Sequence, residues 1–161
     1  MKKQIFTLLT MCVCLVFISC SDDDKNEDQT NYKDIEIVVE RTSNGIDAFF
    51  GGDIITIVSD KDNTVYDASD FDQVLDNDGK KLLSKVLDSF TSSNTYKIKQ
   101  KNINVQFLET PQIKDDVSEE VAENLNLVTK IKIFVDKELV KEQTFNFSLE
   151  GANIQMVTYS K

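Results

Sequence analysis

Hydrophobic and polar residues alternate along most of the chain between residues 34 and 161. An alternation of period two places successive side chains on opposite faces of an extended strand, and it therefore predicts strands with one buried face. Ile35, Ile37 and Val39 form the first such series. The segment 53–58 is apolar on both faces, which is typical of a central strand that is covered on both sides. Because most connections are short, we expect a mostly antiparallel sheet.

One segment, residues 70–90, departs from this period. Four apolar residues have the spacing i, i+3, i+4 and i+7 there: Leu83, Val86, Leu87 and Phe90. This spacing forms one stripe of an amphipathic helix. The polar segment 76–79 favours turns over helix interiors, so we expect a short helix at about 70–76 and a longer one at about 79–90. The predicted fold is a β-rich α+β fold: a sandwich or a partly open barrel with one helical unit near residues 70–90.

The second half of the chain predicts further strands. Apolar positions are even at Tyr96 and Ile98 but odd from Ile103 onward, so residues 99–102 must hold a bulge or a tight turn. Three more features complete the predicted order: a loop with one helical turn at 109–124, a hairpin of the alternating runs 127–135 and 139–149, and a last strand at 153–159.

Residues 1–19 have the features of a secretory signal. Lys2 and Lys3 give a positive start, and an apolar run extends from Ile5 to Ile18. As a helix this run would rise about 21 Å at roughly 1.5 Å per residue, short of the ~30 Å hydrocarbon core of a bilayer. A cleaved signal peptide is therefore favoured over a membrane-spanning helix.

The junction that follows, Phe17-Ile18-Ser19-Cys20, resembles the lipobox of bacterial lipoproteins. A lipobox has a large apolar residue three positions before the cysteine and a small residue directly before it. The resemblance implies cleavage between Ser19 and Cys20 by signal peptidase II. It also implies that the Cys20 sulfur carries diacylglycerol and that the new amino group of Cys20 carries a third acyl chain. We expect no other cofactor.

The acidic segment 21–28 comes directly after Cys20. It resembles the segment that marks lipoproteins of the Bacteroidota type for the outer face of the outer membrane. The resemblance implies a lipid-anchored, surface-exposed protein, and the alternative is the periplasmic face. Such a polar segment cannot bury enough apolar surface to order itself. The expected organisation is a signal peptide at 1–19, the lipidated cysteine with a disordered acidic tether at 20–33, and a single β-rich domain at 34–161.

The residue types that the chain lacks exclude several classes of site. The chain has no histidine, and its three cysteines are Cys12, Cys14 and Cys20. The expected domain thus has neither imidazole nor thiol, which excludes His/Cys zinc sites, Ser-His-Asp and Cys-His catalysis, haem on a histidine and structural disulfides. Because no side chain there has an unperturbed pKa between about 5 and 8, we expect stability to change little from pH 6 to pH 8.

The charge of the chain limits its partners. The formal net charge is −10, and it becomes more negative once Lys2 and Lys3 leave with the signal. Phosphate binding needs a basic surface, whereas this chain has a single arginine, Arg41. We therefore expect no nucleic-acid partner, and we expect contact with the membrane to come from the acyl chains.

Aspartates concentrate in residues 60–78, which raises the hypothesis of a calcium site. The candidate oxygen ligands are Asp60, Asp62, Asp67 and Asp70, with Asn63 and Asp72 nearby. The EF-hand pattern fails, because Val65 holds the position of the glycine and Phe71 that of the bidentate glutamate. The alternatives are an irregular calcium site and a solvated acidic loop, and the loop is the simpler expectation.

No motif identifies a reaction. We expect a membrane-anchored extracytoplasmic lipoprotein whose β-rich domain is not catalytic and binds a protein, a glycan or a small apolar ligand, or supports an assembly. The alternative is an inhibitor or immunity-type protein that turns an acidic face toward a basic partner. A small carboxylate-type hydrolase is a third hypothesis. Steep salt dependence of binding would favour the acidic face, and a closed barrel with a cavity above ~300 Å³ would favour a small ligand.

Overall fold

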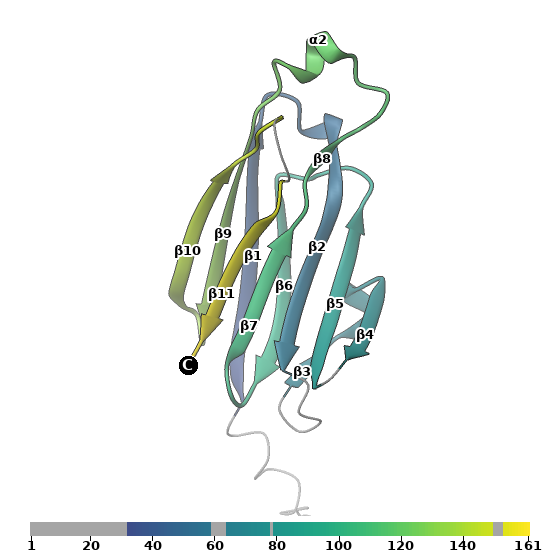
Figure 1. The fold of residues 1–161 in the computed structure, drawn as a ribbon. Helices are drawn as coiled ribbons and strands as arrows, with labels where there is room; N and C mark the ends of the chain where they lie inside the picture. The colour runs from purple at the N-terminus through teal and green to yellow at the C-terminus, as the bar shows by residue number, and fades with distance from the viewer. Residues whose placement is uncertain (1–31, 59–63, 78, 150–152) are drawn as a thin grey trace, which may run out of the picture. The chain divides into compact units, whose positions relative to one another are not determined.

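The computed structural model describes residues 32–58, 64–77, 79–149 and 153–161. Tyr32–Lys161 form one compact unit. This unit is mostly antiparallel β-sheet, as the sequence predicts, and its strands form two sheets (Figure 1). Each sheet ends in two edge strands, so the sheets do not close into a barrel.

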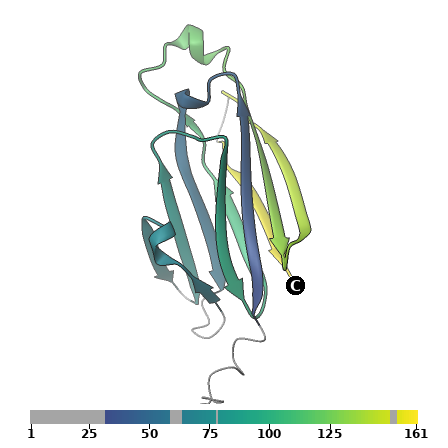
Figure 2. The same ribbon diagram turned by 180° about the vertical axis from the view of Figure 1, so that it is seen from behind.

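The first sheet has the strand order β10-β9-β1-β6-β3 (Figure 2). Its strands are β1 (Lys33–Ser43), β3 (Thr64–Tyr66), β6 (Ser93–Gln100), β9 (Leu127–Val135) and β10 (Glu138–Asn146). In the central strand β1, Ile37 lies opposite Tyr96 of β6 and Ile133 of β9. All three side chains are buried, so the alternating residues of neighbouring strands share one covered face.

The second sheet has the order β11-β7-β2-β5-β4, and β8 extends it beside β2. Its strands are β2 (Phe49–Val58), β4 (Gln73–Asn77), β5 (Lys80–Leu87), β7 (Asn104–Glu109), β8 (Gln112–Ile113) and β11 (Gln155–Ser160). The prediction that residues 53–58 form a central strand is confirmed. Only the inner face of β2 is fully buried, however: Ile55 and Ile57 are buried, whereas Ile54 and Thr56 are partly exposed.

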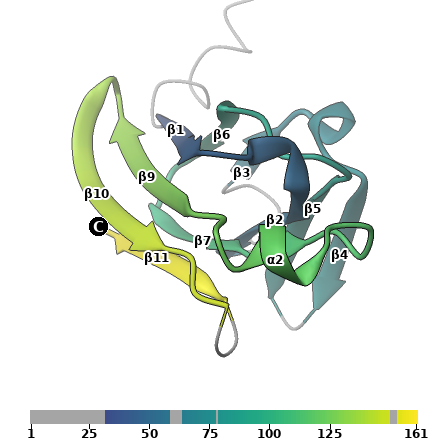
Figure 3. The same cartoon turned by 90° about the horizontal axis from the view of Figure 1, so that it is seen from above.

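The two sheets lie face to face (Figure 3), and their inner faces share one apolar core. Ile37 and Ile133 of the first sheet belong to the same buried cluster as Ile55 and Phe107 of the second. Tyr96 bridges the layers, because its ring lies 6.1 Å from the ring of Phe107. Two antiparallel sheets that pack in this way have the architecture of a β-sandwich.

The predicted helical unit near residues 70–90 is wrong. The structure has an antiparallel hairpin of β4 and β5 there, preceded by a single 3₁₀ turn, η2 (Ala68–Asp70). Leu83 and Leu87 are buried, but an interval of four residues returns to the same face in a strand as well as in a helix. Val86 separates the two patterns, since the helix buries it and the strand exposes it. Gly79, with a positive φ of 75°, lies between the two strands, and Asp-Gly is a hairpin signal.

The other connections follow the sequence more closely. A tight turn links β6 to β7, so the change of parity near residues 99–102 comes from a turn and not from a bulge. The hairpin of β9 and β10 is confirmed, with Asp136 and Lys137 at positive φ in its turn. The predicted helical turn is α2 (Glu119–Ala122), and a second 3₁₀ turn, η1 (Ile46–Ala48), precedes β2.

Candidate functional site

Arg41, the chain's one arginine, is buried between the two sheets. It follows Ile35, Ile37 and Val39 at the same parity of β1, so the strand directs it into the core. Its two anionic partners come from the opposite sheet. Asp53 of β2 and Glu109 of β7 are direct partners across their ladder, and both face Arg41.

Every nitrogen of the Arg41 guanidinium donates a hydrogen bond. Nη2 donates to both carboxylate oxygens of Asp53 at 2.9 and 3.1 Å, and Nε donates to Glu109 Oε1 at 2.5 Å. Nη1 donates to Asn94 Oδ1 and to the Thr91 carbonyl. The ring of Phe90 lies 4.4 Å from the guanidinium carbon. A forked guanidinium with all its donors engaged is the favourable form of a buried cation.

The two carboxyls compete for this single cation. Burial raises the pKa of both Asp53 and Glu109, and the charge of Arg41 opposes that rise in each. The negative charge of Asp53 is the better stabilised of the two, because this carboxylate accepts the forked contact from Arg41 and a hydrogen bond from the Tyr96 hydroxyl at 2.6 Å. Burial and the charge of Asp53 raise the pKa of Tyr96, which keeps that hydroxyl a donor.

The negative charge of Glu109 is stabilised by fewer hydrogen bonds. Its Oε2 atom is buried and accepts no hydrogen bond within the described part of the chain. The Thr129 hydroxyl lies close enough to lower the pKa of Glu109 somewhat, although it forms no hydrogen bond of standard geometry. The buried amide of Gln155, the cross-strand partner of Glu109, is also unpaired among the described residues. Burial thus favours the neutral form of Glu109 more than its contacts favour the charged form, and a proton on Oε2 would supply a donor toward Thr129 or Gln155.

This buried ionic cluster joins the two sheets, but it is closed to ligands. The surface grooves beside β3, β8 and α2 are not lined by Arg41, Asp53, Glu109 or Tyr96. Perturbed carboxyls are frequent in active sites, yet a catalytic group must reach its substrate. The contacts of the cluster are those of a structural connection between the layers.

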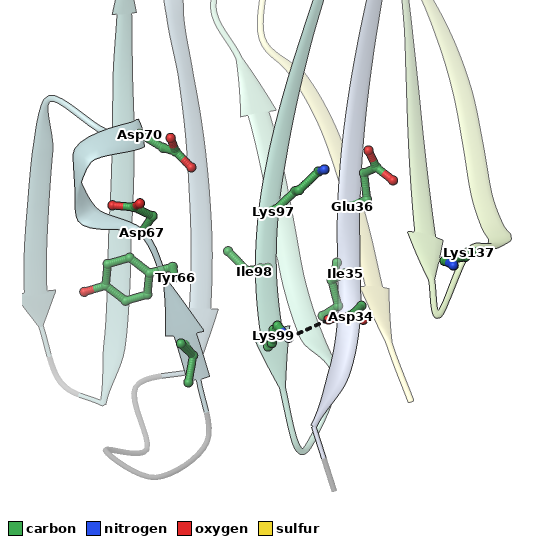
Figure 4. Close-up of a pocket in the computed structure, with 11 residues that line it drawn as sticks. Asp34, Ile35, Glu36, Tyr66, Asp67, Asp70, Lys97, Ile98, Lys99 and Lys137 are labelled. Carbon is green, nitrogen blue, oxygen red and sulfur yellow. Dashed lines mark ion pairs between the residues drawn. The ribbon is translucent and has the colours of Figure 1, made fainter. Parts of the chain in front are cut away.

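A groove of about 490 Å³ lies on the first sheet where β1, β6 and β3 meet η2 (Figure 4). It is lined by Asp34, Ile35, Glu36, Val65, Tyr66, Asp67, Asp70, Lys97, Ile98, Lys99 and Lys137. The register explains the mixture of charges, because Asp34 lies opposite Lys99 and Glu36 lies opposite Lys97. The groove thus presents carboxylates and ammonium groups together, beside the exposed side chain of Val65.

Two carboxylates of the groove have local partners. Asp34 forms an ion pair with Lys99 at 3.2 Å. Asp67 caps η2 by accepting from the hydroxyl and the backbone amide of Ser69, and these bonds lower the pKa of Asp67. The ring of Tyr66 packs edge-on against Phe71 and lies 5.6 Å from the ammonium of Lys81. The groove thus combines charged side chains with an apolar lining, and several of its side chains are held by local contacts.

Two other grooves lie elsewhere on the domain. One of about 560 Å³ lies beside β8 and is lined by Thr110, Pro111, Gln112, Ile113, Phe147, Leu149, Asn153 and Ile154. One of about 430 Å³ lies beside α2 and is lined by Asn44, Glu120, Val121, Asn124 and Leu125. Neither combines groups of both charges as the first groove does.

The calcium hypothesis stays a prediction. Asp60, Asp62 and Asn63 lie outside the described residues. Asp67 is engaged by its own turn, and Asp70 lines the first groove. Asp72 accepts from the Lys85 ammonium at 3.0 Å and from the Val86 amide at 2.7 Å. In the segments that the structure describes, acidic side chains nowhere gather in threes as they would around a metal ion.

The predicted lipidation and cleavage residues, Cys20 and Ser19, also lie outside the described residues and stay predictions. The helices of the described part of the chain are too short to cross a bilayer.

Comparisons with known proteins leave the family open. No family model matches the chain, and no curated protein matches it. Among solved structures, the chain is similar to the crystal structure of a domain of unknown function, DUF4425, from Bacteroides vulgatus. The two are 14% identical, the match covers 81% of this chain and 94% of the other, and the TM-score is 0.45. A similarity of this degree carries no conclusion about function.

The alternating pattern does not by itself predict the buried ionic cluster, although a signal for it is present in the sequence. Arg41 continues the buried parity of β1, Asp53 has the parity of Ile55 and Ile57, and Glu109 has the parity of Phe107. A charged residue at a buried position of a strand needs a buried partner of opposite charge, because an unpaired buried charge is costly. The three residues at such positions are therefore expected to contact one another. The signal is the position of each charged residue in the alternating pattern of its strand, not a sequence motif.

Proposed function

We propose that this chain is an outer-membrane lipoprotein, anchored through acyl chains on Cys20, whose β-sandwich recognises a polar ligand and is not catalytic. The observation that supports a binding role is the groove across β1, β6 and β3, where carboxylates and ammonium groups stand beside exposed Val65. The lipobox-like junction and the acidic segment after it support the anchor and the surface location.

The chemistry of the groove favours a polar ligand such as a glycan or an extended peptide. Lys97 and Glu36 offer a donor and an acceptor side by side across the ladder, which suits hydroxyl or amide groups. A small apolar ligand has less support, because that hypothesis depended on a closed barrel and the sheets do not close. A carboxylate-type hydrolase has less support too, since Asp53 and Glu109, the carboxyls whose pKa is raised by burial, lie away from the groove.

The second candidate function is the inhibitor or immunity-type protein, and one acidic loop favours it. The loop that carries α2 lies at the end of the sandwich away from β3 (Figure 1). Its acidic side chains are Asp115, Asp116, Glu119, Glu120 and Glu123, all partly or fully exposed. Such a loop attracts a basic partner through long-range electrostatics, which salt weakens.

Metabolic labelling with a palmitate analogue tests the anchor. The wild-type chain should incorporate the label and stay with the membrane, and Cys20→Ala should lose both properties. Cys12→Ala and Cys14→Ala are matched controls within the predicted signal and should label normally. Equal labelling of Cys20→Ala would overturn the lipoprotein assignment, and protease access on intact cells distinguishes the outer from the periplasmic face.

Glycan and peptide arrays probed with the purified mature chain test the groove. Val65→Trp fills the groove at a half-exposed position, whereas Val121→Trp adds the same bulk to α2 at an equally exposed position. The groove proposal expects Val65→Trp to lose binding and Val121→Trp to retain it. The reverse result, together with binding that falls steeply with salt, would support the acidic-loop candidate instead.

A further inference from the structure

The outer faces of the two sheets differ sharply in charge. On the first sheet the outward positions carry Asp34, Glu36, Glu40 and Glu142 together with Lys97, Lys99, Lys130 and Lys132, as the register shows. On the second sheet the outward positions of the described strands carry one charged side chain, Lys80. Such a face is unusual in a chain of which 29% of residues are charged.

Apolar side chains gather in one band of this outer face, between outward polar residues such as Ser84, Thr56, Gln106 and Thr158. Six outward side chains form a band across all five strands: Leu75, Leu82, Val86, Ile54, Leu108 and Met156. Leu75 is 57% exposed, Val86 58% and Met156 49%. Figure 1 views this face from the front. A contiguous exposed apolar patch marks an interaction surface more often than an isolated apolar residue does.

The sequence of β2 agrees with a covered outer face. Its apolar residues on both faces predict a strand that is covered on both sides, but Ile54 and Thr56 face outward and are partly exposed in this unit. A second layer over this face would complete the burial that the sequence predicts.

The charge of this face limits which kind of partner can cover it. A basic partner would be attracted to the acidic loop at α2 and not to a face whose one charged outward residue is Lys80. The matching surface must itself carry few charges, and a copy of this face, with Lys80 as the one charged outward residue of the described strands, meets that requirement. In a two-fold arrangement the same patch serves both partners, so the apolar band of one copy packs against the apolar band of the other when the axis passes through the band.

The available area is sufficient for such a pair. Five strands at roughly 4.8 Å spacing and seven residues at roughly 3.4 Å rise give a face of about 600 Å². Two such faces bury about 1,200 Å², the lower end of the range for specific interfaces. We propose that two copies of this chain pair back to back through the outer face of β11-β7-β2-β5-β4.

Cysteine cross-linking of the full chain in its own membrane tests this pairing. Thr56 is the middle member of the row Leu75–Leu82–Thr56–Gln106–Thr158, so a central two-fold axis brings it close to Thr56 of the second copy. Thr56→Cys with a short bismaleimide should yield a covalent dimer. Thr95→Cys, which faces outward from the first sheet, is the matched control and should give only background dimer. The wild-type chain controls for the native cysteines.

A second pair of variants makes the test specific. In the Thr56→Cys chain, Met156→Glu places a charge in the proposed interface and should abolish the dimer. Leu139→Glu introduces the same charge at a similarly exposed apolar position, 47% exposed on β10, and should leave the dimer intact. No dimer from a normally expressed Thr56→Cys chain, equal dimer from Thr95→Cys, or a cross-link from Thr56→Cys to a different protein would each overturn the proposal.

Discussion

Asp53 and Glu109 lie directly opposite each other on β2 and β7, and both carboxyls contact the same guanidinium, that of Arg41. Two acidic groups thus share one cation in a buried space. The arrangement links the sheets, since the carboxyls come from the second sheet and the arginine from the first. It also introduces a pH dependence that the lack of histidine alone does not reveal.

The first prediction concerns Glu109. Its pKa is raised in the folded state, chiefly by burial. The stability that comes from its protonated form is therefore fully present below the unfolded pKa of about 4.3 and is lost as the pH rises through the raised folded pKa. Glu109→Gln keeps the shape and cannot ionise, so it should remove this loss.

Urea unfolding from below the unfolded pKa of a glutamate, at about pH 3, up to about pH 8 measures the effect of Glu109→Gln. Relative to Glu109→Gln, the wild type should lose free energy of unfolding as the pH rises through the raised folded pKa of Glu109. Glu120→Gln on exposed α2 is the matched control and should follow the wild type. Identical pH profiles for wild type and Glu109→Gln would show that Glu109 is ionised throughout.

The second prediction concerns Arg41. Arg41→Ala leaves two buried carboxyls without their cation and should cost about 3–5 kcal/mol of unfolding free energy. Arg41→Lys keeps the charge but not the forked contact, so it should cost less than Arg41→Ala and more than zero. Adding Asp53→Asn and Glu109→Gln to Arg41→Ala removes the unpaired charges and should recover part of the loss. Denaturant melts of the four chains give the comparison.

Much of the fold could be predicted from the sequence because burial has period two. The series Ile35, Ile37 and Val39 correctly predicts the inner face of β1, and the long hairpin of β9 and β10 is correct as well. The helix predicted at residues 70–90 is wrong because Leu83 and Leu87 are four residues apart, and this interval returns to the same face in a helix and in a strand alike. The Asp-Gly pair at 78–79 was the better signal, since it favours a two-residue hairpin turn.

The groove could not be predicted in the same way. Its walls come from segments as distant as Asp34, Asp67 and Lys137, which are brought together by the pairing of β1 with β6 and of β6 with β3. Strand order is not encoded in local periodicity. The buried ionic cluster could be predicted in part. The alternating pattern indicates that each charged residue is buried, but it does not identify the residues that each one contacts.

The third prediction separates strand from helix at β5. Leu87 is 9% exposed and packs with Phe49 and Phe90, whereas its neighbour Val86 is 58% exposed on the opposite face. Leu87→Ala should therefore cost about 2–5 kcal/mol. Val86→Ala should cost less than about 1 kcal/mol, within the range of strand propensity. Chemical denaturation of both variants measures these losses. A large loss of unfolding free energy for Val86→Ala would favour the helix over the strand in this segment.

The last prediction concerns two adjacent glycines in β2. A Cβ atom on Gly51 would lie 2.3 Å from the Thr110 carbonyl oxygen and 3.1 Å from the ring of Phe90. The backbone oxygen cannot move aside without displacing the end of β7, so Gly51→Ala should cost about 1–3 kcal/mol. A Cβ atom on Gly52 meets its nearest neighbour, the Lys85 carbonyl oxygen, at an ordinary 3.5 Å.

Gly52→Ala should therefore be neutral, or should stabilise the chain by about 0.4–1 kcal/mol because alanine restricts the unfolded state. Thermal melts of the two variants provide the measurement, and each serves as the control for the other. Equal melting temperatures would mean that the close approach of Gly51 to Thr110 relaxes freely. The β2–β7 ladder would then be looser at this point than its hydrogen bond from the Thr110 amide to the Gly52 carbonyl, 3.0 Å long, indicates.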